Sequence, residues 1–150
     1  MKWQDMATFV VVALVIETPA GADAPAGRYV VTPPEVRDTE TGLTWVMTAP
    51  TTGGDDGSGG YTLANANAYC ATLGAGWRLP KLKELLTIVD VTKTRGPTID
   101  EAAFPGAPAE SFWSSTSYAG TSNMAWFVTF GYGGTGIDTL MQKYRVRCVR

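Results

Sequence analysis

Apolar and polar side chains alternate along the C-terminal end of the chain, Lys143–Arg150. Successive side chains of a β-strand point to opposite faces, so this alternation predicts a final strand with one core face and one basic face. We therefore expect the C-terminal segment to pack against the centre of the domain. The predicted core face carries Tyr144, Val146 and Cys148, and the other face carries Arg145, Arg147 and Val149.

Two stretches show the spacing of short amphipathic helices. Thr62 is a good N-cap for a helix that runs to about Leu73, and Gly74 is its stop signal. Pro80 is placed to start a second helix that continues through Asp90. The apolar stripe comprises Leu63, Ala66, Cys70 and Leu73 in the first helix, and Leu82, Leu85, Leu86 and Val89 in the second. Cys70 is thus expected to face the core.

Short strands are predicted on the N-terminal side of these helices. Arg28–Thr32 fits an edge strand that Pro33 and Pro34 end, because proline cannot donate to a sheet ladder. A hairpin follows, in which Gly42 supplies the positive φ that such a turn commonly requires. The hairpin strands are Val36–Asp38 and Leu43–Val46.

The C-terminal half is predicted to be rich in strands. Residues 91–111 have little periodicity and are expected to form a long ordered loop anchored by Ile99 and Phe104. Met124–Phe130 is apolar on both faces, which is typical of a central strand. The other predicted elements are a strand that begins at Phe112–Ser115, a turn over Gly131–Gly136 and a short strand over Ile137–Leu140.

The N-terminal residues resemble a secretory signal peptide. Lys2 precedes an apolar run, Met6–Ile16, and Ala22 and Ala24 offer a small-x-small cleavage pattern. The run is shorter than the about 20 apolar residues that span a bilayer, so no stable membrane span is expected after processing. Residues 1–24 are therefore predicted to be a cleaved signal peptide, so that the mature protein is secreted or lies in the periplasm or at the cell surface. The alternative is an N-terminal helix that is retained and packs on a partner.

Composition favours one domain with a real core. The chain has 150 residues, of which 45% are hydrophobic, and a net charge of -2. That charge gives no general attraction to nucleic acid. We expect residues 25–35 to be an N-terminal edge segment and residues 36–150 to be the domain. Cys70 and Cys148 are the only cysteines; in an exported chain they most simply form one disulfide, and their spacing does not suggest zinc.

A polar loop, Thr51–Gly60, contains no apolar residue and is predicted to lie on the surface. Asp55 and Asp56 within it are candidate calcium ligands, since a hard cation requires several oxygen ligands. The more common explanation of such a sequence is a solvated glycine and aspartate loop without metal.

Six short motifs in order resemble the Lcl C-terminal domain family over about residues 36–150. They are Thr41–Trp45, Ala68–Cys70, Trp77–Pro80 with Glu84–Leu85, Phe112–Ser115, Ala125–Val128 and Val146–Arg150. The resemblance implies a bacterial domain of unknown function with the C-type-lectin-like fold, related to the formylglycine-generating-enzyme type. Such a fold is α+β, with two short helices, a small mixed or antiparallel sheet, long loops, and a disulfide between the first helix and the last strand.

The motif residues are expected to be mostly framework. A loop-rich domain requires large buried anchors, so core packing is the more common role for its tryptophans than stacking on a sugar. Arg78 is expected to donate hydrogen bonds to loop carbonyls. The tryptophans concerned are Trp45, Trp77, Trp113 and Trp126.

Catalysis is not expected. The chain has no histidine, which removes the usual general base and the commonest metal ligand. Asp100 and Glu101 are sequence neighbours that would point apart in a strand. The formylglycine-generating relatives use cysteines for oxidation, whereas Cys70 and Cys148 are both assigned to a structural bond. The calcium-dependent sugar-binding motifs of animal C-type lectins are also missing.

Loops of the C-terminal half are the candidate ligand surface. The resemblance implies that the ligand face lies between about Ser114 and Gln142, and this stretch mixes aromatic and small polar side chains suited to recognition. The candidate binding residues are Ser117, Tyr118, Thr121, Asn123, Tyr132 and Asp138. We predict a non-catalytic module that binds carbohydrate or a protein surface, without a cofactor. The alternative is a structural subunit that assembles with its own copies through the retained N-terminal segment.

Overall fold

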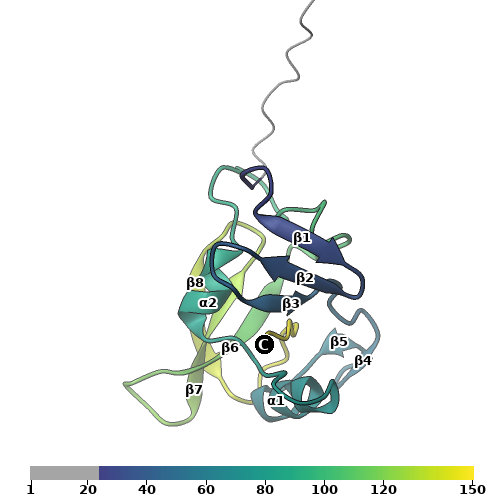
Figure 1. Ribbon diagram of the computed structural model, residues 1–150. Coiled ribbons are helices and arrows are strands. Elements are labelled where there is room, and N and C mark those ends of the chain that lie inside the picture. Colours follow the sequence, from purple (N-terminus) through teal and green to yellow (C-terminus); the bar gives the residue numbers. More distant parts are fainter. Residues whose placement is uncertain (1–23) are drawn as a thin grey trace, which may run out of the picture.

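A computed structural model describes residues 24–150, which form three small sheets and two short helices (Figure 1). This α+β arrangement agrees with the predicted fold class. The predicted signal peptide lies outside the described residues, apart from Ala24. The N-terminal antiparallel sheet contains β1 (Tyr29–Thr32), β2 (Glu35–Asp38) and β3 (Thr44–Val46), and the parallel pair is β4 (Gly53–Gly54) with β5 (Ser58–Gly60). The remaining elements are α1 (Leu63–Thr72), α2 (Leu82–Thr87), β6 (Ser111–Ser117), β7 (Met124–Thr129) and β8 (Thr135–Thr139).

The N-terminal sheet follows the predicted pattern. β1 lies at the edge of the order β1-β2-β3, and Gly42 has a φ of 73° in the turn between β2 and β3. Val36 pairs with Trp45 across β2 and β3, and both side chains are fully buried. The predicted edge strand and the predicted hairpin are confirmed.

A partly buried ion pair joins this sheet to the second helix. Asp38 is buried, and its carboxylate accepts hydrogen bonds from Arg28 Nη2 at 3.0 Å and Nε at 3.3 Å. Arg28 Nη2 also donates to the carbonyl of Thr87 at the end of α2. Burial alone would raise the pKa of Asp38, but the hydrogen bonds from Arg28 and from the backbone N–H of Glu40 hold that pKa below its ordinary value.

The Arg28–Asp38 pair predicts a loss of stability in acid. A carboxyl group with a lowered folded pKa contributes stability above its unfolded pKa, and this contribution is lost as the pH falls through the folded value. We expect Asp38→Asn to lower the free energy of unfolding at pH 7 by about 2 kcal/mol, because Arg28 loses its buried charged partner and keeps only the exposed Glu40. Urea unfolding at pH 7 and below pH 4 checks both effects. An unchanged acid dependence in Asp38→Asn would contradict the assignment.

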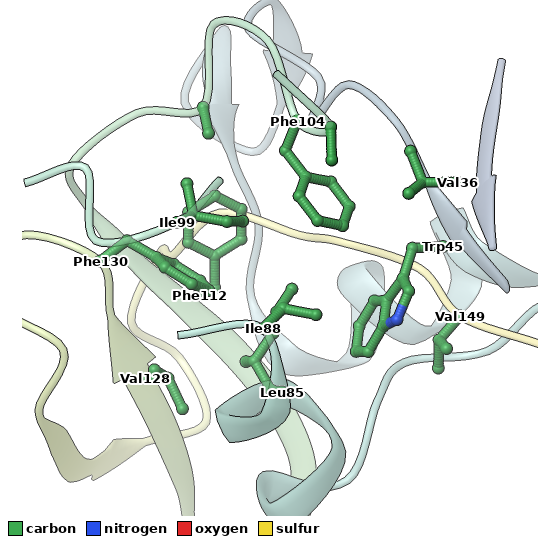
Figure 2. Close-up of a cluster of buried hydrophobic side chains, with 12 residues drawn as sticks. Val36, Trp45, Leu85, Ile88, Ile99, Phe104, Phe112, Val128, Phe130 and Val149 are labelled. Carbon is green, nitrogen blue, oxygen red and sulfur yellow. The ribbon is translucent and has the colours of Figure 1, made fainter. Parts of the chain in front are cut away.

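The C-terminal sheet separates two clusters of buried side chains. β7 is its central strand, as predicted, with β6 and β8 antiparallel on either side. The first cluster contains Phe112 of β6 and Val128 of β7. The second cluster contains Trp113 of β6 and Ala125 of β7. In the first cluster, Figure 2 shows Leu85 of α2 and Ile88, which follows the helix, pointing toward the other labelled core side chains. These include Trp45, Ile99, Phe104, Phe112 and Phe130. Ile99 and Phe104 therefore anchor the long loop, as predicted.

A disulfide joins Cys70 of α1 to Cys148, and both cysteines belong to the second cluster. The two Cα atoms are 5.5 Å apart, and the cysteines are separated by 78 residues in sequence. The predicted pairing is confirmed, and it closes most of the domain into a single covalent loop.

The C-terminal segment differs from its prediction, because no regular strand forms over Lys143–Arg150. The segment is extended and pairs by single bridges with separate neighbours: Tyr61, Phe112, Trp45 and Arg78. The expected basic face is also wrong, since Arg147 and Val149 are buried. The physical reason is that the segment passes between the two clusters and is covered on both sides. Val146 and Cys148 lie in the second cluster, and Val149 lies in the first.

Three further local predictions require correction. α2 ends at Thr87 rather than at Asp90, with Ile88 as its C-cap. In α1, Leu73 is 38% exposed and does not belong to the buried stripe, because it follows the last helical residue. The glycine and aspartate loop contains the β4 and β5 pair, and its last residues are buried. No helix among residues 24–150 combines the length and the apolar character needed to cross a membrane.

Candidate functional site

The structure separates the six candidate binding residues into three places. Ser117, Tyr118, Thr121 and Asn123 lie together where β6 turns into β7. This turn projects from the body of the molecule (Figure 1). The other two residues lie elsewhere: Tyr132 follows the opposite end of β7, and Asp138 lies within β8.

An aromatic pair forms the base of the projecting turn. The rings of Tyr118 and Trp126 meet edge to face, with centroids 5.9 Å apart and planes at 71°. Both side chains are half-buried, and Ile137 lies opposite Trp126 in β8 and is exposed. A Cβ on Gly120 would collide with the ring of Tyr118, so the absence of a side chain allows the ring to lie over the turn. We call Ser117, Tyr118, Thr121, Asn123, Trp126 and Ile137 the hairpin surface.

Polar groups of the turn are held in place by short-range hydrogen bonds. The Thr121 hydroxyl donates to Asn123 Oδ1 at 2.6 Å. The backbone N–H of Tyr118 donates to the carbonyl of Met124, and that of Leu140 donates to the carbonyl of Asn123. The hairpin surface therefore presents ordered amide and hydroxyl groups beside two aromatic rings.

Asp138 serves the fold rather than the hairpin surface. Its Oδ2 accepts a hydrogen bond from the Tyr144 hydroxyl at 2.8 Å. The Tyr144 ring packs between Trp113 and Phe127, with centroids 4.8 Å and 4.7 Å away. Burial and the bond to Asp138 raise the pKa of Tyr144 to about 12. Tyr132, in contrast, is 76% exposed.

The framework predictions for the tryptophans and for Arg78 hold in part. Trp45 and Trp113 are fully buried, and the Trp113 indole N–H donates to the carbonyl of Tyr61 at 2.8 Å. Trp77 and Trp126 are only half-buried. Arg78 donates to the carbonyl of Leu79, but its main partner is the Glu84 carboxylate, which it meets through both Nη atoms at 2.7 Å.

A polar cavity of about 370 Å³ lies away from the hairpin surface. It opens between the β4–β5 loop, the start of β6 and the C-terminal segment, so three distant parts of the sequence meet there. Sequence reasoning did not find it, because no local pattern links these segments. The one sequence signal that bears on the cavity is the alternation of arginines in the C-terminal segment, and that alternation predicts a basic strand face instead of a cavity wall. Its charged lining residues are Asp56, Glu110, Lys143 and Arg145.

The candidate calcium ligands make hydrogen bonds within their own loop and to the following helix. Asp55 accepts from the backbone N–H of Thr62 and from the Asn65 side chain, both at 2.5 Å. Asp56 Oδ1 accepts from the backbone N–H groups of Ser58 and Gly60, both at 2.9 Å. Among residues 24–150, no three acidic, histidine or cysteine side chains gather as a metal site.

Comparison with known families gives one match. A family model described as Lcl C-terminal domain matches residues 34–150, which is most of the chain and contains both the hairpin surface and the polar cavity. Among curated proteins, no match to the chain is found.

Proposed function

The chain belongs to the Lcl C-terminal domain family, and from this premise we propose that it is a non-catalytic, exported binding module with a C-type-lectin-like fold. In this proposal the hairpin surface recognises carbohydrate or a protein surface outside the bacterial cytoplasm. The observation that carries it is the edge-to-face pair of Tyr118 and Trp126 beside the ordered polar turn.

The chemistry of this surface supports recognition. Tyrosine and tryptophan bury a large area on binding at little cost in conformational entropy, since each has only two side-chain torsions. The hydroxyl and amide groups of Thr121 and Asn123 can pair with a polar ligand surface. The disulfide between Cys70 and Cys148 supports a working place outside the reducing cytoplasm. Neither cysteine is free, which supports a structural role for both.

Tyr118 is expected to be the main anchor of ligand binding. We predict that Tyr118→Ser weakens binding about thirtyfold, which corresponds to the loss of one hot-spot side chain of about 2 kcal/mol. The measurement is binding of the purified protein to an array of immobilised glycans and surface proteins, followed by titration of the positive ligands.

Tyr132→Ser is the matched control for this experiment. It removes an equally large and more exposed ring from the other end of β7. The control is expected to bind like the wild type. Equal losses in both variants, or full binding by Tyr118→Ser, would contradict the proposed surface.

A second candidate function is self-assembly as a structural subunit, with the N-terminal segment retained. One observation favours it: the edge strand β1 exposes Val30 by 49% and Val31 by 41% close to the start of the described chain. Exposed edge strands with apolar side chains are common sites of pairing with another chain. Light scattering of the purified protein over a range of concentrations tests this candidate.

A further inference from the structure

The polar cavity has walls that are fixed without a ligand. Arg145 Nε and Nη2 donate to the two carboxylate oxygens of Glu110 at 2.8 Å and 3.1 Å. Nη1 of the same guanidinium donates to the carbonyls of Ser58 and Pro50. These contacts join the β4–β5 loop to the start of β6. A ligand that enters would therefore meet side chains that are already ordered, which lowers the entropic cost of binding.

The charges that line the cavity balance. Asp56 and Glu110 are negative, and Lys143 and Arg145 are positive. Backbone N–H groups of Ser58 and Gly60 lower the pKa of Asp56, and the Arg145 guanidinium lowers the pKa of Glu110, so both are ionised hydrogen-bond acceptors at neutral pH. Lys143 Nζ donates to the carbonyl of Asp55 at 3.1 Å, and an ammonium group has three donors in all. The cavity thus offers acceptors and donors without a net charge.

From these observations we infer that the cavity is a second binding site, for a neutral polyhydroxylated molecule of one or two sugar rings. Each hydroxyl of such a molecule both donates and accepts, which matches carboxylate oxygens beside an ammonium group. The volume lies within the range of about 300–1,000 Å³ that small-molecule sites occupy.

The pairing inside the cavity favours a neutral ligand over a charged one. Arg145 and Glu110 already neutralise each other through two hydrogen bonds. Because the two negative and two positive side chains cancel, the lining has no net charge that would attract an anion or a cation in preference to a neutral molecule. An amino-acid zwitterion would have to compete with the ion pair of Arg145 and Glu110, which is already formed.

This site is independent of the proposed function of the hairpin surface. The cavity contacts Ser111 and Thr129, where β6 begins and β7 ends, whereas the hairpin surface lies at the other end of the same ladder. A ligand of one site can therefore be told from a ligand of the other by the residues that it perturbs.

The test is a nuclear magnetic resonance titration of the ¹⁵N-labelled full chain with D-glucose, N-acetylglucosamine and maltose, each in the millimolar range. At least one sugar is expected to shift the amide signals of residues 58–60, 111 and 143–145. Glycine, as a zwitterion, is titrated in parallel and is expected to shift none of them.

Lys143→Ala removes the ammonium group from an exposed side chain, and the fold is expected to survive. The sugar affinity should fall about tenfold, the value of one charged hydrogen bond. Lys83→Ala, on an exposed residue of α2 outside the cavity, is the matched control and should bind normally. Lys143→Gln retains a donor and should restore part of the affinity, provided that its spectrum matches the wild type.

Three results would overturn the second site. The first is the absence of shifts at the cavity residues with all three sugars. The second is a response to glycine in place of the sugars. The third is equal sugar binding by Lys143→Ala and the wild type. Shifts confined to residues 117–123 would support the hairpin surface and overturn the cavity site, so the two proposals fail separately.

Discussion

Replacing Cys70 and Cys148 together with alanine is expected to lower the free energy of unfolding by about 4 kcal/mol. The bond closes a loop of 78 residues, and a loop of that length removes a large part of the conformational entropy of the unfolded chain. Both sulfur atoms are buried in the second cluster, so the substitution also leaves less apolar contact there.

Guanidinium unfolding of the double variant and of the wild type measures this loss. The wild type in the presence of a thiol reductant is the matched control, since it breaks the same bond without changing the sequence. A loss below about 1 kcal/mol in both conditions would show that packing alone holds the C-terminal segment, which contradicts the role given to the disulfide.

Arg147→Ala is expected to cost about 3–5 kcal/mol, while Arg147→Met should cost less than half of that. Arg147 is fully buried, and its guanidinium lies over the rings of Phe104 at 4.8 Å and Phe112 at 5.6 Å. Alanine leaves a cavity between these rings, whereas methionine fills most of it.

The charge of Arg147 itself is costly. Only Nη1 is paired, with the carbonyls of Val46 and Met47, while Nε and Nη2 have no hydrogen-bond partner among the described residues. Burial lowers the pKa of Arg147 to about 10. A base with a lowered folded pKa destabilises the fold below that value, and this penalty disappears as the pH rises through it. Methionine removes the penalty at every pH.

Urea unfolding of both Arg147 variants at pH 7 separates packing from hydrogen bonding. We expect Arg147→Met to have a clearly higher free energy of unfolding than Arg147→Ala. If methionine were as destabilising as alanine, the hydrogen bonds to Val46 and Met47, rather than the volume between the rings, would hold the segment in place.

Features with a local signature could be predicted from the sequence. Gly42 identified the hairpin turn, the apolar run of β7 identified the central strand, and the cysteine count identified the disulfide. The hairpin turn and the central strand depend on residues that are close in sequence, and each cysteine has only one other cysteine with which it can form a disulfide. The long loop with Ile99 and Phe104 was predicted for the same reason, because large apolar residues in a segment without periodicity have to be anchors.

Features that depend on distant contacts could not be predicted. The C-terminal segment has the alternation of a strand, but Val149 bridges both Trp45 and Arg78, and this places the segment between two clusters instead of at a sheet edge. The same alternation predicts that Arg147 lies on a basic face, whereas the contacts on both sides of the segment bury it. The candidate binding residues do not form one site, because Tyr118 precedes β7 and Tyr132 follows it. The length of the strand therefore separates two residues that are close in sequence.

The intact mass of the protein isolated from its native host, with and without reduction and alkylation, tests most directly whether it is an exported binding module or a self-assembling subunit. We expect a chain that starts near residues 23–26 and that alkylates at Cys70 and Cys148 only after reduction. A chain that starts at Met1, or one whose cysteines alkylate without reduction, would contradict export and would favour assembly through the retained N-terminal segment.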